Sequence, residues 1–284
     1  MTNPTFLVNN FESGTSTTTG AGSVSLQASR RTFSGALAML FVVCMAATTV
    51  WCISMPAFDD MPMPGGWKMS MAWMRMPGQT WADAAASFVG MWVVMMAAMM
   101  LPSLTPVLWR YRESVWRTRE TYRDRLTMLV GLGYFFVWAM VGLAVYPVGA
   151  AMATIEMEQP VLARALPIVA GLVVLMAGAL QFTKWKAHHL SCCREAPGRD
   201  CVLSAHPAAA WRLGLRFGLH CGLSCANLTA ILLVVGVMDL RAMAAITAAI
   251  TAERLAPASE HAARATGIVV AGAGLILIAR AAGL

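Results

Sequence analysis

The chain has 284 residues, of which 58% are hydrophobic and only 12% are charged. Soluble globular domains average about 45–50% apolar and about 25% charged residues, so this chain lacks the charge needed for a solvated surface. The composition excludes a soluble protein and makes lipid the solvent for much of the outer surface. The net charge of +7 does not indicate nucleic-acid binding, because the arginines lie in short polar segments between apolar runs, as membrane topology requires.

The N-terminal segment Met1–Ala28 is rich in Thr, Ser, Gly and Asn and has no apolar periodicity, which indicates a flexible tail. Arg30 and Arg31 superficially match a twin-arginine export signal. The apolar run that follows, 33–55, has about the 20 residues that a helix needs to cross a bilayer, whereas the apolar part of a signal peptide usually has about 7–15. We therefore interpret the two arginines as the flank of a first transmembrane helix, and residues 29–284 as a single transmembrane domain.

Six apolar segments approach or exceed the length needed to cross a bilayer as helices. They are residues 33–55, 82–108, 126–152, 162–182, 213–238 and 262–282. A further segment, 239–255, has a helical pattern broken by Arg241, Glu253 and Arg254; an interfacial helix, a re-entrant piece and a seventh span all fit it. The predicted fold class is all-α: a polytopic bundle of six transmembrane helices with this one short helix beside them.

The distribution of Lys and Arg predicts the topology, because connections that stay in the cytoplasm carry an excess of both residues. Six arginines lie in the connection Arg110–Arg125, and two lysines and four arginines lie in Lys184–Arg216. The connection Pro56–Trp81 has only Lys68 and Arg75, and Ala153–Val161 has neither Lys nor Arg. The first pair of connections is therefore expected inside and the second pair outside, with the N-terminus in the cytoplasm.

Methionines are concentrated in the second predicted span. Met91, Met95 and Met99 fall on one stripe of a helix, and Met96 and Met100 fall on the adjoining one. Thioethers are soft ligands that suit Cu(I) and not hard cations. Met is also a flexible packing residue that apolar helices use freely. The pattern therefore leaves a Cu(I)-binding stripe and ordinary packing both open.

The fifth predicted span contains a histidine and two cysteines, His220, Cys221 and Cys225. Cysteines four residues apart place both thiols on one face of a helix, about one turn apart. Glycines at 214, 218 and 222 form the small-residue repeat that lets another helix approach closely, and such a neighbour could complete a soft-metal site. Buried cysteine and close packing explain the same residues without a metal, but a histidine within a membrane helix is functional by default. We favour the metal site.

The inner connection contributes two histidines and two adjacent cysteines, His188, His189, Cys192 and Cys193. Because no paired Cys-x-x-Cys spacing occurs, a zinc finger is excluded. Adjacent thiolates with histidines nearby are suited to capturing and passing on a soft ion. The alternative is a solvated loop with incidental cysteines. The outer connection is rich in methionine, and Met63, Met69 and Met71 in it are candidates for collecting Cu(I).

Several runs together resemble one known family, the bacterial predicted metal-binding integral membrane proteins. The run Trp92 to Pro102 (WVVMMAAMMLP) resembles the signature second helix of that family. The resemblance extends from about Ala82 to Pro257 and includes the runs 133–138 (GYFFVW), 179–186 (ALQFTKWK), 214–225 (GLRFGLHCGLSC), 236–239 (GVMD) and 252–255 (AERL).

Members of this family are described as metal-binding or copper-chaperone-like, which implies a copper-related role in the bacterial inner membrane. The positions that match the family's marks are Met95, Met96, Met99, Met100, Pro102, Cys193, Cys221, Cys225 and Glu253. The chain departs from the pattern around Cys225, because the family commonly has another Cys and a Trp there. Ser224 and the pair Ala226–Asn227 stand in this chain.

We therefore expect a non-enzymatic membrane protein that binds Cu(I) and acts in its transfer, delivery or transport. The expected partners are the lipid bilayer, other membrane subunits or a copper-receiving protein, and no nucleic acid. The alternative is an accessory subunit of a larger membrane complex, such as a copper-dependent enzyme. A thiol redox enzyme ranks last, because thiols four residues apart on a helix reach disulfide distance only with distortion. The sequence has no nucleotide-binding motif, so we do not expect this chain alone to pump ions with ATP.

Overall fold

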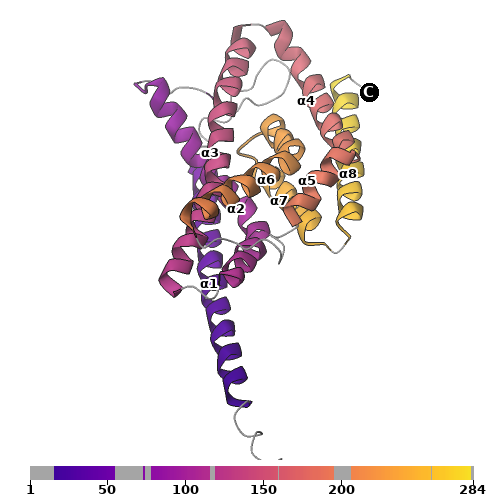
Figure 1. The fold of residues 1–284 in the computed structure, drawn as a ribbon. Coiled ribbons are helices and arrows are strands. Elements are labelled where there is room, and N and C mark those ends of the chain that lie inside the picture. The colour runs from indigo at the N-terminus through magenta and orange to yellow at the C-terminus, as the bar shows by residue number, and fades with distance from the viewer. Residues whose placement is uncertain are drawn as a thin grey trace, which may run out of the picture. The chain divides into compact units, whose positions relative to one another are not determined.

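The computed structural model describes residues 16–54, 73, 78–115, 119–158, 160–194, 206–256 and 258–282, and within these ranges it is helical, with no strand. The helices are α1 (Ser16–Ser54), α2 (Trp81–Ser114), α3 (Glu120–Glu158), α4 (Pro160–Leu180), α5 (Lys184–Arg194), α6 (Pro207–Val235), α7 (Leu240–Leu255) and α8 (Ser259–Ala281) (Figure 1). The predicted all-α class is confirmed. The chain has two compact units, Met1–Leu40 and Phe41–Leu284, and the packing described below lies within the second.

Five described helices are long and apolar enough to cross a membrane: α2, α6 and α8 over their whole length, α1 from Gln27 and α3 as far as Ile155. A sixth candidate is the pair Ala165–Leu180 and Lys184–Ser191, which is bent by 65°. Each of the six predicted segments overlaps one of these candidates, the segment 162–182 overlapping the bent pair. α7 has sixteen residues and is not among these candidates, and the three alternatives for 239–255 stay predictions.

Two segments predicted outside the spans are helical in the structure. α1 begins at Ser16, inside the segment predicted as a tail, and the role of Met1–Ala28 as a tail stays a prediction. Residues Lys184–Arg194, predicted as part of a polar inner connection, form the helix α5. The chain turns at Gln181–Thr183 between α4 and α5, and the amide of Lys186 bonds to the Thr183 hydroxyl at 3.3 Å, which caps the start of the new helix.

Two helix pairs approach closely through glycine. α4 and α8 run side by side (Figure 1), and a Cβ added to Gly178 would lie 2.6 Å from the Ala271 amide nitrogen. α3 packs on α6 in the same way: a Cβ on Gly214 would lie 2.3 Å from the Val130 carbonyl oxygen, and one on Gly218 would lie 2.9 Å from that of Tyr134. Nothing lies within 4 Å of the corresponding position on Gly222. The predicted small-residue stripe is therefore a packing surface at its first two glycines.

This difference along one helix yields a stability prediction. We expect Gly214→Ala to destabilise the protein by about 1–3 kcal/mol or more, because overpacking here forces backbone against backbone. Gly222→Ala on the same helix should be neutral or stabilising by about 0.5–1 kcal/mol, since Ala is the better helix former and meets no neighbour. Thermal unfolding of both variants in detergent measures the contrast. Equal melting temperatures for the two variants would contradict the α3–α6 contact.

Candidate metal centre

Three sulfur side chains and a tyrosine meet in the interior where α6 faces α2 and α3. Cys221 and Cys225 are buried, with 1% and 2% of their surfaces exposed, and both carry thiols rather than a disulfide. The two cysteines lie one helical turn apart on the same face of α6. The Cys221 thiol also lies 3.9 Å from the Met100 thioether sulfur, and the Tyr134 hydroxyl lies 2.8 Å from the Cys221 sulfur. The i, i+4 spacing therefore produces a thiol pair with a thioether beside it.

A guanidinium from α7 borders this sulfur cluster. Arg254 Nη2 donates to the Cys225 sulfur at 3.6 Å and to the Ser224 hydroxyl at 3.2 Å, and its Nη1 donates to the Ser103 hydroxyl at 3.3 Å. The Ser224 hydroxyl in turn bonds to the Cys221 carbonyl at 2.9 Å. A cation that donates to sulfur stabilises a thiolate, the form in which cysteine binds a metal.

A buried ion pair lies on the other side of Ser224. Lys186 Nζ is 2.9 Å from Glu253 Oε2, and both side chains are 2% exposed. The same ammonium donates to the Ser224 carbonyl and, at 3.4 Å, to Asn227 Oδ1, so its three donors have three acceptors. Gln181 Nε2 donates to Glu253 Oε1 at 2.9 Å. The network therefore fixes α5, α6 and α7 around the stretch of backbone that carries the two cysteines.

Glu253 lies on α7, outside the candidate membrane spans. Burial raises the pKa of its carboxyl, and the Lys186 ammonium is the largest influence in the opposite direction. The carboxylate is thus held in a site where its charge depends on the lysine.

The predicted histidines from two separate segments come together at the α5–α6 contact. His189 Nδ1 lies 3.4 Å from His220 Nδ1. The rings of His188 and His189 have centroids 5.4 Å apart, and those of His189 and His220 are 5.7 Å apart. His188 is exposed and the other two are half-buried. These imidazoles form a row that starts at the surface and ends on the residue next to Cys221.

The other predicted ligands are distributed less compactly. Met91 and Met95 line a separate cavity near the end of α1, while Met96 and Met99 are buried in the core. Cys192 and Cys193 lie near the end of α5, but their side chains are outside the described residues, as is the whole methionine-rich segment around Met63, Met69 and Met71. Within the part of the chain that the structure describes, no group of three or more His, Cys, Asp or Glu could hold a metal ion. At the thiol pair the Met100 thioether adds a third sulfur donor.

A family model described as copper chaperone, PpoB2, matches residues 89–277. The chain belongs to this copper chaperone family. The matched range contains Met100, Tyr134, Lys186, both cysteines of α6 and Glu253–Arg254, and it leaves out α1. No curated protein and no solved structure matches the chain.

Three side chains of the cluster are not singled out by the sequence analysis: Tyr134, Lys186 and Arg254. Lys186 enters the sequence analysis as a topology signal and Arg254 as a helix interruption, and both lie in runs that resemble the family without being among its marked positions. A usable signal was present for Arg254, because a charged pair, Glu253 and Arg254, within an otherwise apolar segment needs buried partners. Lys186, which follows the span 162–182, has a weaker signal of the same kind.

Proposed function

We propose that this member of the copper chaperone family binds one Cu(I) ion inside its helix bundle and passes it to a copper-receiving protein. Cys221 and Cys225 are the primary ligands and Met100 is the third. The observation that carries the proposal is the contact of the buried Cys221 thiol with the Met100 thioether, with the buried thiol of Cys225 one turn further along α6, in a chain of this family.

The chemistry of the three donors favours a soft ion. Thiolate and thioether sulfur select Cu(I), whereas Mg²⁺ and Ca²⁺ require oxygen ligands. Each thiol loses its proton as its sulfur–copper bond forms, so the ion exchanges for protons and no electron is transferred. Met100 is the weaker, neutral ligand. It can be displaced by a sulfur of an incoming partner, and such ligand exchange suits delivery better than storage.

The position of the cluster supports work within the membrane. Its ligands lie on α2 and α6, both of which are long and apolar enough to span a bilayer. Both cysteines are almost fully buried, so a bound ion would be shielded from oxidants and from competing ligands in water. The row of His188, His189 and His220 ends one residue before Cys221 on α6 and offers imidazoles through which the ion can leave or arrive.

The test is Cu(I) affinity measured by competition with a chromogenic chelator under anaerobic, reducing conditions. We expect Cys221→Ser/Cys225→Ser to weaken binding by at least about a hundredfold, because even residues that only support metal ligands are worth about 10–100-fold. Cys44→Ser is the matched control, since Cys44 is also a buried thiol but lies on α1, outside this cluster. The copper content of both proteins, extracted from native membranes, provides a second measurement.

A double variant that binds as many Cu(I) equivalents as the wild type, with the same affinities, would show that the thiol pair holds no copper and would sink the proposal. The alternative prediction is an accessory subunit of a copper-dependent membrane enzyme. Purification of the protein from native membranes distinguishes it from a chaperone. A chaperone should elute without stoichiometric partners, whereas a subunit should bring its complex with it.

A further inference from the structure

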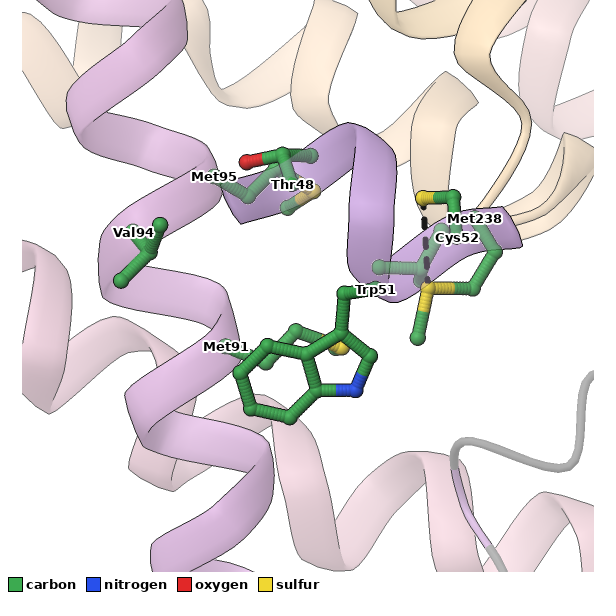
Figure 2. Close-up of a pocket in the computed structure, with 8 residues that line it drawn as sticks. Thr48, Trp51, Cys52, Met91, Val94, Met95 and Met238 are labelled. Atoms are coloured by element: carbon green, nitrogen blue, oxygen red, sulfur yellow. Dashed lines mark hydrogen bonds between the residues drawn. The ribbon is translucent and has the colours of Figure 1, made fainter. Parts of the chain in front are cut away.

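A second group of sulfur side chains surrounds a small cavity apart from the Cys221–Cys225 cluster. Figure 2 shows side chains from α1, α2 and the turn between α6 and α7 around it. The cavity has a free volume of about 10 Å³, which is room for one water-sized particle. The residues that line it are Thr48, Trp51, Cys52, Met91, Val94, Met95, Val237 and Met238.

Sulfur dominates the donors that this cavity offers. The Cys52 thiol lies 3.9 Å from the Met238 thioether sulfur (Figure 2), and Met91 and Met95 add two more thioethers to the wall. The Thr48 hydroxyl donates to the Cys44 carbonyl at 2.8 Å, so its proton is directed at its own helix. A hard cation would find few oxygen ligands here, whereas a soft monovalent ion would find one thiol and up to three thioethers.

We propose that this cavity is a second Cu(I) site, with the Cys52 thiolate and the Met238 thioether as its first two ligands and Met91 or Met95 as the third. Binding releases the Cys52 proton as the sulfur–copper bond forms. One of its ligands, Cys52, lies on α1, outside the residues 89–277 that the family model matches.

The two sulfur clusters share the helix α2. Met95 lines the cavity and Met100 contacts Cys221, and five residues correspond to about 7.5 Å along a regular helix. An ion bound at Cys52 could thus move along the methionines of α2 to the thiol pair. This role as a loading site rests on the proposed function, whereas the existence of the second site does not.

The experiment measures the alkylation of each cysteine separately. Full-length protein in nanodiscs is titrated with Cu(I) without oxygen, labelled with N-ethylmaleimide and digested, and each cysteine is quantified by mass spectrometry. We expect Cu(I) to protect Cys52 in the wild type and equally in Cys221→Ser/Cys225→Ser. Met238→Leu, which keeps the volume but removes the thioether, should raise the Cu(I) concentration for half-protection of Cys52 by at least about tenfold.

Two controls isolate the cavity. Met128→Leu changes an exposed methionine of α3 and should leave the protection of Cys52 unchanged. Cys44, eight residues earlier on the same helix, should label equally with and without Cu(I), and its protection in parallel with Cys52 would overturn the proposal by showing unspecific binding. Identical protection of Cys52 in Met238→Leu and Met128→Leu would show that the Met238 thioether is not a ligand, and it would overturn the proposal as well.

The outcomes separate this site from the proposed function. Protection of Cys221 and Cys225 without any protection of Cys52 would overturn the second site and leave the chaperone site intact. Protection of Cys52 without protection of the α6 pair would support the second site and overturn the proposed function. If Cys52 resists labelling even without copper, X-ray absorption at the copper edge decides. The number of sulfur atoms bound to copper is compared between Cys221→Ser/Cys225→Ser and the triple variant that also carries Cys52→Ser. An unchanged number overturns the second site, and a smaller number in the triple variant supports it.

Discussion

Replacement of Lys186 by Met is expected to lower the free energy of unfolding by about 3–5 kcal/mol, the usual cost of leaving a buried charge without its partner. The lysine and Glu253 are both 2% exposed and lie 2.9 Å apart. Methionine fills much of the same volume, so the loss reports the unpaired Glu253 carboxylate more than a void. Unfolding in mixed detergent micelles measures the change. Lys184→Met, two residues earlier on α5 and exposed, is the matched control and should have little effect.

The pH dependence distinguishes a lost charge from lost packing. Burial already raises the pKa of Glu253, and Lys186 is the main influence that lowers it, so its removal raises the folded-state pKa further above the unfolded value. A folded state that binds more protons gains stability as the pH falls. The deficit of Lys186→Met should therefore shrink on acidification towards the unfolded-state pKa of a glutamate. The double variant Lys186→Met/Glu253→Gln should recover most of the stability at neutral pH.

A deficit that is the same at every pH, and that the double variant does not reduce, would show that Lys186 acts through its methylenes alone. If Lys186→Met is as stable as Lys184→Met, the Lys186–Glu253 ion pair does not contribute to holding α5 and α7 on α6.

The spans were predictable because a bilayer demands about 20 apolar residues in sequence, and α2, α3, α6 and α8 satisfy this requirement from composition alone. α5 was not predictable on that basis. Its sequence, with two lysines and two histidines before the cysteines, is typical of a polar connection. Its helical form depends on Lys186 finding Glu253 and the Ser224 carbonyl, and neither partner is local in sequence.

The candidate site was predictable to the extent that it is local. The spacing of Cys221 and Cys225 places both thiols on one helical face, and the methionines of α2 were recognisable as soft donors. Which methionine meets the thiols depends on how α2 crosses α6, and the helical period cannot supply this. Tyr134 reaches Cys221 across the α3–α6 contact, and the glycines at 214 and 218 that allow this contact were recognisable while the tyrosine was not.

The charges around the thiol pair lead to the last prediction. With copper bound, the positive groups are Lys186, Arg254 and the ion, and the negative groups are Glu253 and the thiolates of Cys221 and Cys225. Their charges balance, which matters because an uncompensated charge in a low-dielectric interior is costly. Arg254 is the member that touches the ligand itself, at 3.6 Å from the Cys225 sulfur.

Arg254→Met should therefore weaken Cu(I) binding by about 10–100-fold, the range for residues that support metal ligands. Arg254→Lys keeps the charge but not the fork that reaches Ser103, Ser224 and Cys225, and it should recover part of the affinity. Arg241→Met, an exposed arginine on the same helix, is the control. The Cu(I) dissociation constant and the melting temperature are measured together, since a purely structural arginine would change only the second. Wild-type affinity in Arg254→Met would show that the thiol pair needs no compensating charge from α7, and Arg254 would then be a residue of the helix contact rather than of the copper site.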